Sequence, residues 1–276
     1  MASFDQLISH RFRGFAACDN RLAGLLEALD NSVQQVEFDI RVAKCGTPLI
    51  THDEAASDRA GTLRHIRNVR DADRMGLGGE FAAMVTADAL LAAIAAHPNR
   101  TCRLLIDIKD AGFEEAIYAL CAKYGLRDRT LWVSWLPEVL YALHELDEAA
   151  SLCLSHWCQS PNEMIRAVHH VFEATHGHIE RPDRTLVHGE RSGWFVDGPL
   201  RGTLRRMVDW VCVPAGQITA ELVRDYHSDG TQISAFSYLT REKIEVAERA
   251  FGHDAFFCDA REPFDAYSAS LAGSGR

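Results

Sequence analysis

The sequence predicts an α/β protein with the TIM (β/α)8 barrel fold, in which parallel strands alternate with helices. Apolar strand-like runs and helix-like segments alternate about eight times over roughly 250 residues, which matches the size and order of such a barrel. Charged side chains recur at the ends of several strand-like runs, where a barrel places its chemistry. An open doubly wound sheet remains the alternative, because alternation alone does not distinguish the two arrangements.

The strand predicted from Val36 to Val42 has an unusual inner face. Apolar residues alternate with charged ones there, and this period of two is typical of a strand. The alternation places Glu37 and Asp39 side by side on one face. Burying carboxylates is costly unless a cation compensates them. That face is therefore either in water or in contact with a metal ion or a cationic ligand, and helices cover the outer face of a parallel barrel.

A turn at 44–47 leads from this strand into a short apolar run, Pro48 to Ile50, which ends at His52 and Asp53. The polar segment 54–84 then predicts an excursion above the core that is partly helical. Its arginines between Arg59 and Arg74 favour a solvated face, and the alternative is a lid that attracts a phosphodiester.

The remaining segments continue the alternation. Helices are predicted at 21–29, 87–96, 113–124, 137–146, 162–173, 219–227 and 241–251, and strands at 102–109, 131–135, 151–157, 210–213, 232–238 and 255–259. Thr86 and Thr219 are expected helix caps. A ninth strand-like run at 186–189 exceeds the eight strands of a barrel, and we assign it to a segment that decorates the barrel and is not part of it. We expect a single barrel domain over 1–267, followed by a flexible tail at 268–276.

Composition excludes several classes of partner. The chain has 276 residues, 47% of them hydrophobic and 25% charged, as in ordinary globular proteins. A net charge of −10 argues against nucleic acid or an anionic membrane as the main partner. No run approaches the ~20 apolar residues of a membrane span, and no secretory signal is apparent. We expect a cytoplasmic protein without stable membrane insertion. The sequence does not indicate an oligomeric state.

Three residue types invite other interpretations. The eight cysteines form no C-x-x-C pair, so buried free thiols are favoured over a zinc ribbon or a disulfide framework. His176, His178 and His188 could bind zinc, but a solvent-exposed histidine-rich loop is favoured. Trp132, Trp135 and Trp157 are assigned to the core and the barrel mouth.

The polar residues at strand ends form a candidate site. In chain order they are His10, Arg11, Glu37, Asp39, His52, Asp107 and Lys109. Three carboxylates suit a hard divalent cation such as Mg²⁺ or Ca²⁺. Two histidines can act as base or nucleophile and as acid, and the arginine and lysine can hold an anion. Together these groups suit attack at phosphorus.

Three segments of the chain, LISHR, VEFDIRVAKCGTPLITHDE and LLIDIKD, resemble the three motifs of the glycerophosphodiester phosphodiesterases, which are TIM barrels. In that family an apolar strand ends in His-Arg, an E-x-D strand precedes a glycine turn and a His-Asp pair, and a later strand ends in E-x-K. Weaker similarity continues at 19–20, 133–135, 230–238 and 257–259, so the resemblance covers most of the chain.

The resemblance implies a role for each candidate residue. The implied roles are catalysis for His10 and His52, binding of one divalent metal ion (Mg²⁺ or Ca²⁺) for Glu37, Asp39 and Asp107, and phosphate binding for Arg11 and Lys109. The implied reaction is metal-dependent hydrolysis of a small-molecule glycerophosphodiester to glycerol 3-phosphate and an alcohol.

The chain departs from the family pattern at several positions. Asp107 replaces a glutamate and is one methylene shorter, while Arg21, Phe236 and Leu239 replace Thr, Trp and Asn in the walls. The related sphingomyelinase D-like barrels also have Asp-x-Lys at the third motif and form a cyclic phosphate. Their C-terminal tail motif is absent here, so that activity ranks second. A barrel that binds a phosphorylated ligand without cleaving it is the remaining alternative.

Overall fold

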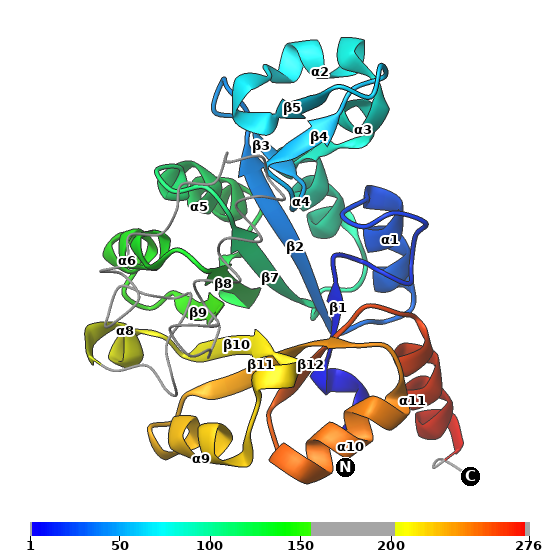
Figure 1. The fold of residues 1–276 in the computed structure, drawn as a ribbon, viewed down its shortest axis with the longest axis vertical. Coiled ribbons are helices and arrows are strands. Elements are labelled where there is room, and N and C mark those ends of the chain that lie inside the picture. Colours follow the sequence, from blue (N-terminus) through cyan, green and yellow to red (C-terminus); the bar gives the residue numbers. More distant parts are fainter. Residues whose placement is uncertain (1, 156–201, 274–276) are drawn as a thin grey trace.

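The computed structural model describes residues 2–155 and 202–273 and forms a closed barrel of parallel strands surrounded by helices (Figure 1). The barrel strands in the described residues are β1 (Leu7–His10), β2 (Gln35–Val42), β7 (Arg103–Ile108), β8 (Thr130–Ser134), β9 (Ser151–Ser155), β10 (Trp210–Pro214), β11 (Gln232–Tyr238) and β12 (Ala255–Cys258). β1 pairs in parallel with both β12 and β2, which closes the sheet. The closure confirms the TIM barrel over the open sheet.

Among the described residues, eight helices cover the outside of the barrel, and six of them lie where the periodicity predicts a helix. Their bounds are α1 (Leu22–Asp30), α4 (Ala87–Ala96), α5 (Glu114–Lys123), α6 (Pro137–Leu146), α8 (Gly202–Met207), α9 (Ala220–Ser228), α10 (Arg241–Phe251) and α11 (Glu262–Gly273). Short 3₁₀ helices are η1 (Phe4–Gln6), η2 (Ile66–Asn68), η3 (Arg127–Arg129) and η5 (Ala215–Gln217). The hydroxyl of Thr86 accepts a hydrogen bond from the backbone N–H of Ala89, and that of Thr219 accepts one from the backbone N–H of Leu222, which confirms both caps.

Helix α11 is the main element that the sequence did not predict. It includes residues 268–273, which were assigned to a flexible tail, and it packs Phe264 and Tyr267 into the core. Phe264, Tyr267 and Leu271 lie at i, i+3 and i+7, so their spacing could have indicated this helix. The helix expected at 162–173, the run at 186–189, the histidines of 169–188, Trp157 and residues 274–276 lie outside the described residues. The division into one domain therefore stays a prediction.

Two separate cores result from the alternation along each strand. Inside the barrel lie Ile8, Leu105, Leu131, Val133, Cys153, Trp210, Cys212, Ala255 and Phe257. Val36, Phe38 and Ile40 face outward and are fully buried beneath the helices. Because successive side chains alternate between faces, Glu37 and Asp39 point into the barrel. The prediction of an inward acidic face is confirmed.

The excursion at 54–84 forms a small lobe beside the barrel mouth, shown in cyan at the top of Figure 1. Its elements, with the strands that flank it, are β3 (Pro48–Ile50), β4 (Ala55–Ser57), β5 (Leu63–His65), α2 (Asp71–Leu77), α3 (Gly79–Ala83) and β6 (Val85–Thr86). A small core that includes Ile66, Val69 and Phe81 holds it together. The hairpin of β4 and β5 was not predicted, because each strand has only three residues.

The arginines of this lobe differ from the prediction at one position. Arg74 is largely buried, pairs with Asp71 at 2.9 Å and donates to the carbonyls of Phe81 and Met84. The prediction of a solvated face is therefore wrong for Arg74, whose guanidinium stabilises the backbone at the end of α3.

Other expectations concern cysteine, tryptophan and the membrane. The seven cysteines in the described residues are free thiols, and five of them are buried. Trp132 is buried in the outer core and stacks on Tyr118, whereas Trp135 lies at the barrel mouth. Across residues 2–155 and 202–273, no helix has the length and apolar character needed to cross a bilayer.

Candidate active site

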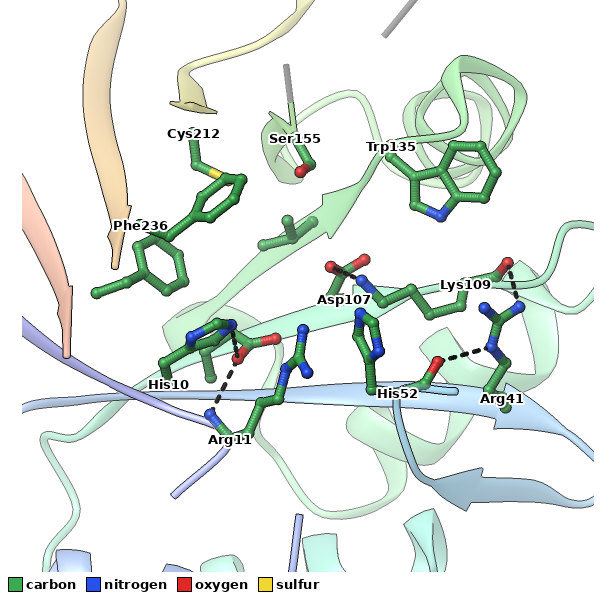
Figure 2. Close-up of a pocket in the computed structure, with 13 residues that line it drawn as sticks. His10, Arg11, Arg41, His52, Asp107, Lys109, Trp135, Ser155, Cys212 and Phe236 are labelled. Carbon is green, nitrogen blue, oxygen red and sulfur yellow. Dashed lines mark hydrogen bonds and ion pairs between the residues drawn. The ribbon is translucent and has the colours of Figure 1, made fainter. Parts of the chain in front are cut away.

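A cavity of about 270 Å³ opens at the C-terminal ends of the barrel strands and has two unlike walls (Figure 2). The polar wall comes from β1, β2, β7 and the segment after β3, and consists of His10, Arg11, Glu37, Arg41, His52, Asp107 and Lys109. The opposite wall consists of Val133, Trp135, Ser155, Cys212, Phe236 and Phe257. The structure thus brings six of the seven predicted residues to the cavity surface, and the seventh, Asp39, lies buried beside them.

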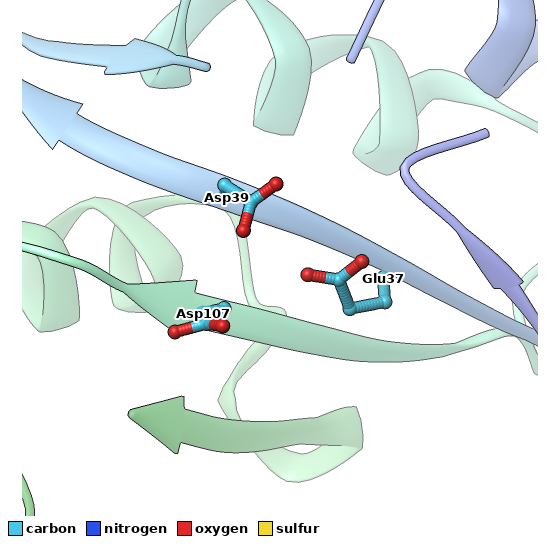
Figure 3. A group of neighbouring side chains, drawn as sticks. All are labelled: Glu37, Asp39 and Asp107. Atoms are coloured by element: carbon cyan, nitrogen blue, oxygen red, sulfur yellow. The ribbon is translucent and has the colours of Figure 1, made fainter. Parts of the chain in front are cut away.

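The three predicted metal ligands form one cluster on two neighbouring strands (Figure 3). Glu37 and Asp39 project from β2, and Asp107 is the direct partner of Asp39 on β7. One carboxylate oxygen of each residue lies within 4.8 Å of those of the other two. Oδ1 of Asp39 and Oδ1 of Asp107 are both buried; the first faces the ammonium of Lys109, and the second accepts no hydrogen bond from the described residues. Such oxygen atoms are the ligands that Mg²⁺ or Ca²⁺ prefers, so the residues fit a divalent cation.

Cationic and amide groups surround this cluster. Nζ of Lys109 forms ion pairs with Asp107 and, at 3.1 Å, with Oδ1 of Asp39. Nε of Arg11 lies 3.2 Å from Oδ2 of Asp39. The same oxygen accepts a hydrogen bond of 2.9 Å from the side-chain amide of Asn20. These contacts balance part of the negative charge of the buried acids.

The environment moves the pKa values of the two acids of β2 in opposite directions. Burial raises the pKa of Glu37 well above its ordinary value, and the charge of Asp39 adds to this effect. Burial would also raise the pKa of Asp39, but nearby cations, Lys109 foremost, outweigh it and hold that pKa below its ordinary value.

His10 is the last residue of β1 and is held from both sides. Its Nδ1 lies 2.5 Å from Oδ1 of Asp259, which directly follows β12. Its Nε2 faces the acidic cluster, 3.8 Å from Oε2 of Glu37. The ring packs edge-on against Phe257 with centroids 5.5 Å apart. Burial lowers the pKa of His10, although the hydrogen bond to Asp259 opposes this.

Asp259 is itself fixed by two further donors. Its Oδ2 accepts a hydrogen bond of 2.7 Å from the hydroxyl of Ser237 and pairs with Arg13 at 2.9 Å. Burial would raise the pKa of Asp259, but these contacts and His10 together lower it. An ionised carboxylate at Nδ1 favours the tautomer of His10 that has its proton there and a lone pair on Nε2.

His52 reaches the same cavity from the segment after β3 and is more exposed. Its Nδ1 lies 2.7 Å from Oδ1 of Asp53, a residue mostly in solvent. Its backbone carbonyl accepts a hydrogen bond of 3.0 Å from Nε of Arg41. Burial lowers the pKa of His52, and the nearby charge of Lys109 adds to this.

Sequence reasoning missed several residues of the site. Asn20 and Asp259 lie in segments that were compared with the family, but neither was given a role. Asn20 adopts a left-handed conformation with φ of 53°, which asparagine tolerates better than most residues. Arg41 could have been found, because it lies two and four residues after Asp39 and Glu37 and shares their face of β2.

Known proteins with similar sequences have one name in common, although no family model matches the chain. The human protein "glycerophosphodiester phosphodiesterase 1" is 27% identical over 160 residues, which cover 54% of this chain and 48% of that protein. The mouse protein of the same name is 27% identical over 161 residues with the same coverage. The chain thus spans about half the length of the curated relatives it matches.

Solved structures with the same fold cover nearly the whole chain. A glycerophosphodiester phosphodiesterase from Parabacteroides distasonis is 13% identical, with a TM-score of 0.66 and full coverage of both chains. One from Thermotoga maritima is 16% identical, with a TM-score of 0.63 over 98% of this chain and 99% of that chain. A phosphodiesterase from Oleispira antarctica, solved with the product sn-glycerol-3-phosphate, is 17% identical, with a TM-score of 0.62 over 97% and 96%. At these identities the likeness shows the fold.

Proposed function

We propose that this chain, a member of the glycerophosphodiester phosphodiesterase family, hydrolyses a glycerophosphodiester to glycerol 3-phosphate and an alcohol. The main support is the gathering of two histidines, an acidic cluster and two cations around one cavity. Similarity to proteins of that name supports the reaction class, and the sn-glycerol-3-phosphate found with the Oleispira protein supports the product.

Glu37, Asp39 and Asp107 would together hold one divalent cation, Mg²⁺ or Ca²⁺. Their oxygen atoms lie close enough to share an ion, and Oδ1 of Asp107 accepts no hydrogen bond within the described residues. When bound, the ion would offset negative charge on the phosphoryl oxygens. Asp107 is one methylene shorter than the glutamate of the family pattern that the chain resembles, and its pairing with Lys109 keeps it directed at the cluster.

Arg11 and Lys109 would orient the phosphate. Both line the cavity, and both already contact Asp39. Guanidinium and ammonium groups in a partly dry site bind phosphate oxygens through charge-assisted hydrogen bonds. The two side chains approach from β1 and β7, so they can hold the phosphate between the histidines.

The two histidines would divide the proton transfers. Asp259 holds a proton on Nδ1 of His10, which leaves Nε2 available as the base or nucleophile for the attacking step. His52, on the more open side of the cavity, would protonate the departing alkoxide. The two rings come from different segments, the end of β1 and the loop after β3, which suits groups that act on opposite sides of one phosphorus.

The departing alcohol would lie along the apolar wall. Trp135, Cys212 and Phe236 form much of this wall, and Ser155 is its one polar side chain among the described residues. An apolar surface stabilises an alcohol with methylene groups more than a charged one. The wall therefore distinguishes the leaving group, while the polar wall binds glycerol phosphate.

A cyclic phosphate product is the second candidate, because Asp107 and Lys109 reproduce the Asp-x-Lys pattern of sphingomyelinase D-like barrels. The test is a screen of phosphodiester headgroups, with Mg²⁺ or Ca²⁺ added, in which the phosphorus product is identified by NMR. Hydrolysis predicts glycerol 3-phosphate from the first turnover. Accumulation of a cyclic phosphate would replace this proposal with the second candidate, and binding without turnover would leave a phosphate-binding barrel.

A further inference from the structure

Arg41 is a cavity residue of β2 without a part in the function proposed above. It follows Glu37 and Asp39 on the inward face, and only 11% of its side chain is exposed. A buried guanidinium is costly unless an opposite charge and hydrogen-bond acceptors compensate it. The partners that Arg41 has therefore indicate what it does.

The guanidinium of Arg41 joins the two segments that bear His52 and Lys109 (Figure 2). Nε donates to the backbone carbonyl of His52 at 3.0 Å. Nη1 donates to the backbone carbonyl of Lys109 at 3.3 Å. The antiparallel pairing of β2 with β3 ends at Ile50, and the N–H of Thr51 still donates to the carbonyl of Asp39 at 3.1 Å, so His52 is the first residue beyond these backbone contacts. The contact with Arg41 therefore holds the backbone directly after its last contact with β2.

Asp110 anchors this arrangement. Its Oδ1 pairs with Nη1 of Arg41 at 2.7 Å, and its Oδ2 accepts a hydrogen bond of 2.8 Å from the backbone of Val42. The carboxylate thus ties the end of β7 to the end of β2 and orients the guanidinium between them. A planar guanidinium can donate in several fixed directions at once, whereas a lysine ammonium cannot reproduce that geometry.

We propose that Arg41 is a positioning residue that fixes the backbone of His52 relative to Lys109, with Asp110 as its anchor. This inference rests on the proposed function, in which His52 protonates the leaving group and Lys109 holds the phosphate. Arg41 sets the distance between these two groups through their carbonyls, while their side chains remain free to face the cavity. The Nη2 atom of Arg41 donates no hydrogen bond within the described residues.

The competing explanation is an ion pair that only stabilises the barrel mouth. Such a pair would change unfolding temperature and would affect all substrates alike. A residue that acts through His52 has two distinct consequences. Its loss affects substrates with poor leaving groups most, because these need the proton, and its effect disappears once His52 is removed.

The test is steady-state kinetics of the full chain with saturating Mg²⁺ or Ca²⁺ on two substrates. Glycerophosphocholine releases an alkoxide that needs protonation, whereas bis(p-nitrophenyl) phosphate releases a stable phenolate. Arg41→Gln should lower kcat on glycerophosphocholine by about 10- to 100-fold with little change in KM, since a misplacement of about 1 Å can cost that much. The loss on bis(p-nitrophenyl) phosphate should be several-fold smaller.

A double variant and a matched control complete the experiment. In the His52→Ala background, Arg41→Gln should cause no further loss on either substrate. Arg41→Lys should not restore activity, and Asp110→Asn should give a smaller loss with the same substrate pattern. The control is Arg64→Gln, which breaks another arginine–aspartate pair, with Asp58 at 2.7 Å, in the 54–84 lobe, and should leave kcat unchanged.

The outcomes separate this inference from the function beneath it. Full activity of His52→Ala on both substrates would refute the assigned role of His52, whatever Arg41 does. A His52→Ala variant of reduced but measurable activity, with multiplicative losses in the double variant, would overturn the positioning role alone. Equal losses on the two substrates, or full rescue by Arg41→Lys, would also overturn it. If Arg41→Gln does not fold, as measured by circular dichroism, Asp110→Asn provides the same comparison.

Discussion

Nδ1 of His10 lies 2.5 Å from Oδ1 of Asp259, although 249 positions separate the two residues in the chain. Parallel pairing of β1 with β12 closes the barrel and sets Ser9 beside Cys258, the two residues that precede them. The closure of the fold therefore creates the histidine–aspartate pair. His10 and Asp259 come together only if the first strand, β1, pairs with the last, β12.

Replacement of Asp259 by asparagine should lower kcat by about 100-fold or more with little change in KM. The amide would hold its NH₂ toward Nδ1 and favour the tautomer with a proton on Nε2, the wrong one for a base. Steady-state kinetics on glycerophosphocholine measures this effect. Ser237→Ala, which removes one of the donors to Asp259, should cost less than tenfold. Unchanged kcat in Asp259→Asn would contradict the pairing as a functional one.

Removal of divalent metal should abolish turnover and lower thermal stability. Because the ion would bind only the folded cluster, adding Mg²⁺ or Ca²⁺ to protein dialysed against EDTA should raise the unfolding temperature. Glu37→Gln should lose this response, as measured by calorimetry. The control is Asp88→Asn, an exposed carboxylate on α4 that pairs with Lys123 and should retain the full response. If EDTA changed neither the turnover nor the unfolding temperature of the wild type, the metal site would be ruled out.

The apolar wall predicts a preference for substrates with longer alkyl alcohols. Each buried methylene contributes about 0.8 kcal/mol, so kcat/KM should rise about fourfold per methylene until the wall is covered. A series of alkyl glycerophosphodiesters measures this slope, and Phe236→Ser should flatten it. Leu239→Ser is the control, because Leu239 is 59% exposed and does not line the cavity. A flat slope in the wild type would show that the alcohol lies elsewhere.

Stability should fall as the pH decreases from about 6.5 to 4, in part because of His253. Burial lowers its pKa to about 4, and its side chain is bonded to the hydroxyl of Tyr238 at 3.1 Å. In this range the unfolded chain binds a proton that the folded protein does not, so protonation favours unfolding. The free energy of unfolding decreases gradually as the pH falls below the pKa of the unfolded state. At pH 5 the part of this decrease that is due to His253 is about 2 kcal/mol.

Urea unfolding at pH 7 and pH 5 measures this contribution. The free energy of unfolding of His253→Gln should decrease less between the two pH values than that of the wild type, by about 2 kcal/mol. Other titrating groups are the same in both proteins, so their contributions cancel in the comparison. Parallel decreases in the two proteins would mean that His253 does not titrate as its burial implies.

Local patterns predicted much of the fold and the site. The alternation in 36–42 gave both the strand and the inward direction of Glu37 and Asp39, because a period of two defines a face without knowledge of the neighbours. Helix α10 has the bounds that its periodicity predicts, 241–251. Its apolar stripe and charged outer face are both complete within the segment itself.

The missed features depend on distant contacts. The partner of His10 is known only when β12 is placed beside β1, and the contacts of Arg41 only when β7 lies beside β2. Arg74 is buried because the carbonyls of α3 surround it, which no property of the arginine-rich segment indicates. Helix α11 is stabilised by the contacts of Phe264 and Tyr267 with the core, although their spacing with Leu271 is itself helical.

The central claim is that His10 and His52 act together on a phosphodiester in this cavity. The most direct measurement is turnover of glycerophosphocholine by the wild type and by His10→Ala and His52→Ala, with metal present and glycerol 3-phosphate as the measured product. We predict that each substitution lowers kcat by at least about 100-fold, as expected for loss of an acid or base, while the unfolding temperature stays close to that of the wild type. Turnover at the wild-type rate in both variants, on every phosphodiester that the wild type cleaves, would contradict the account.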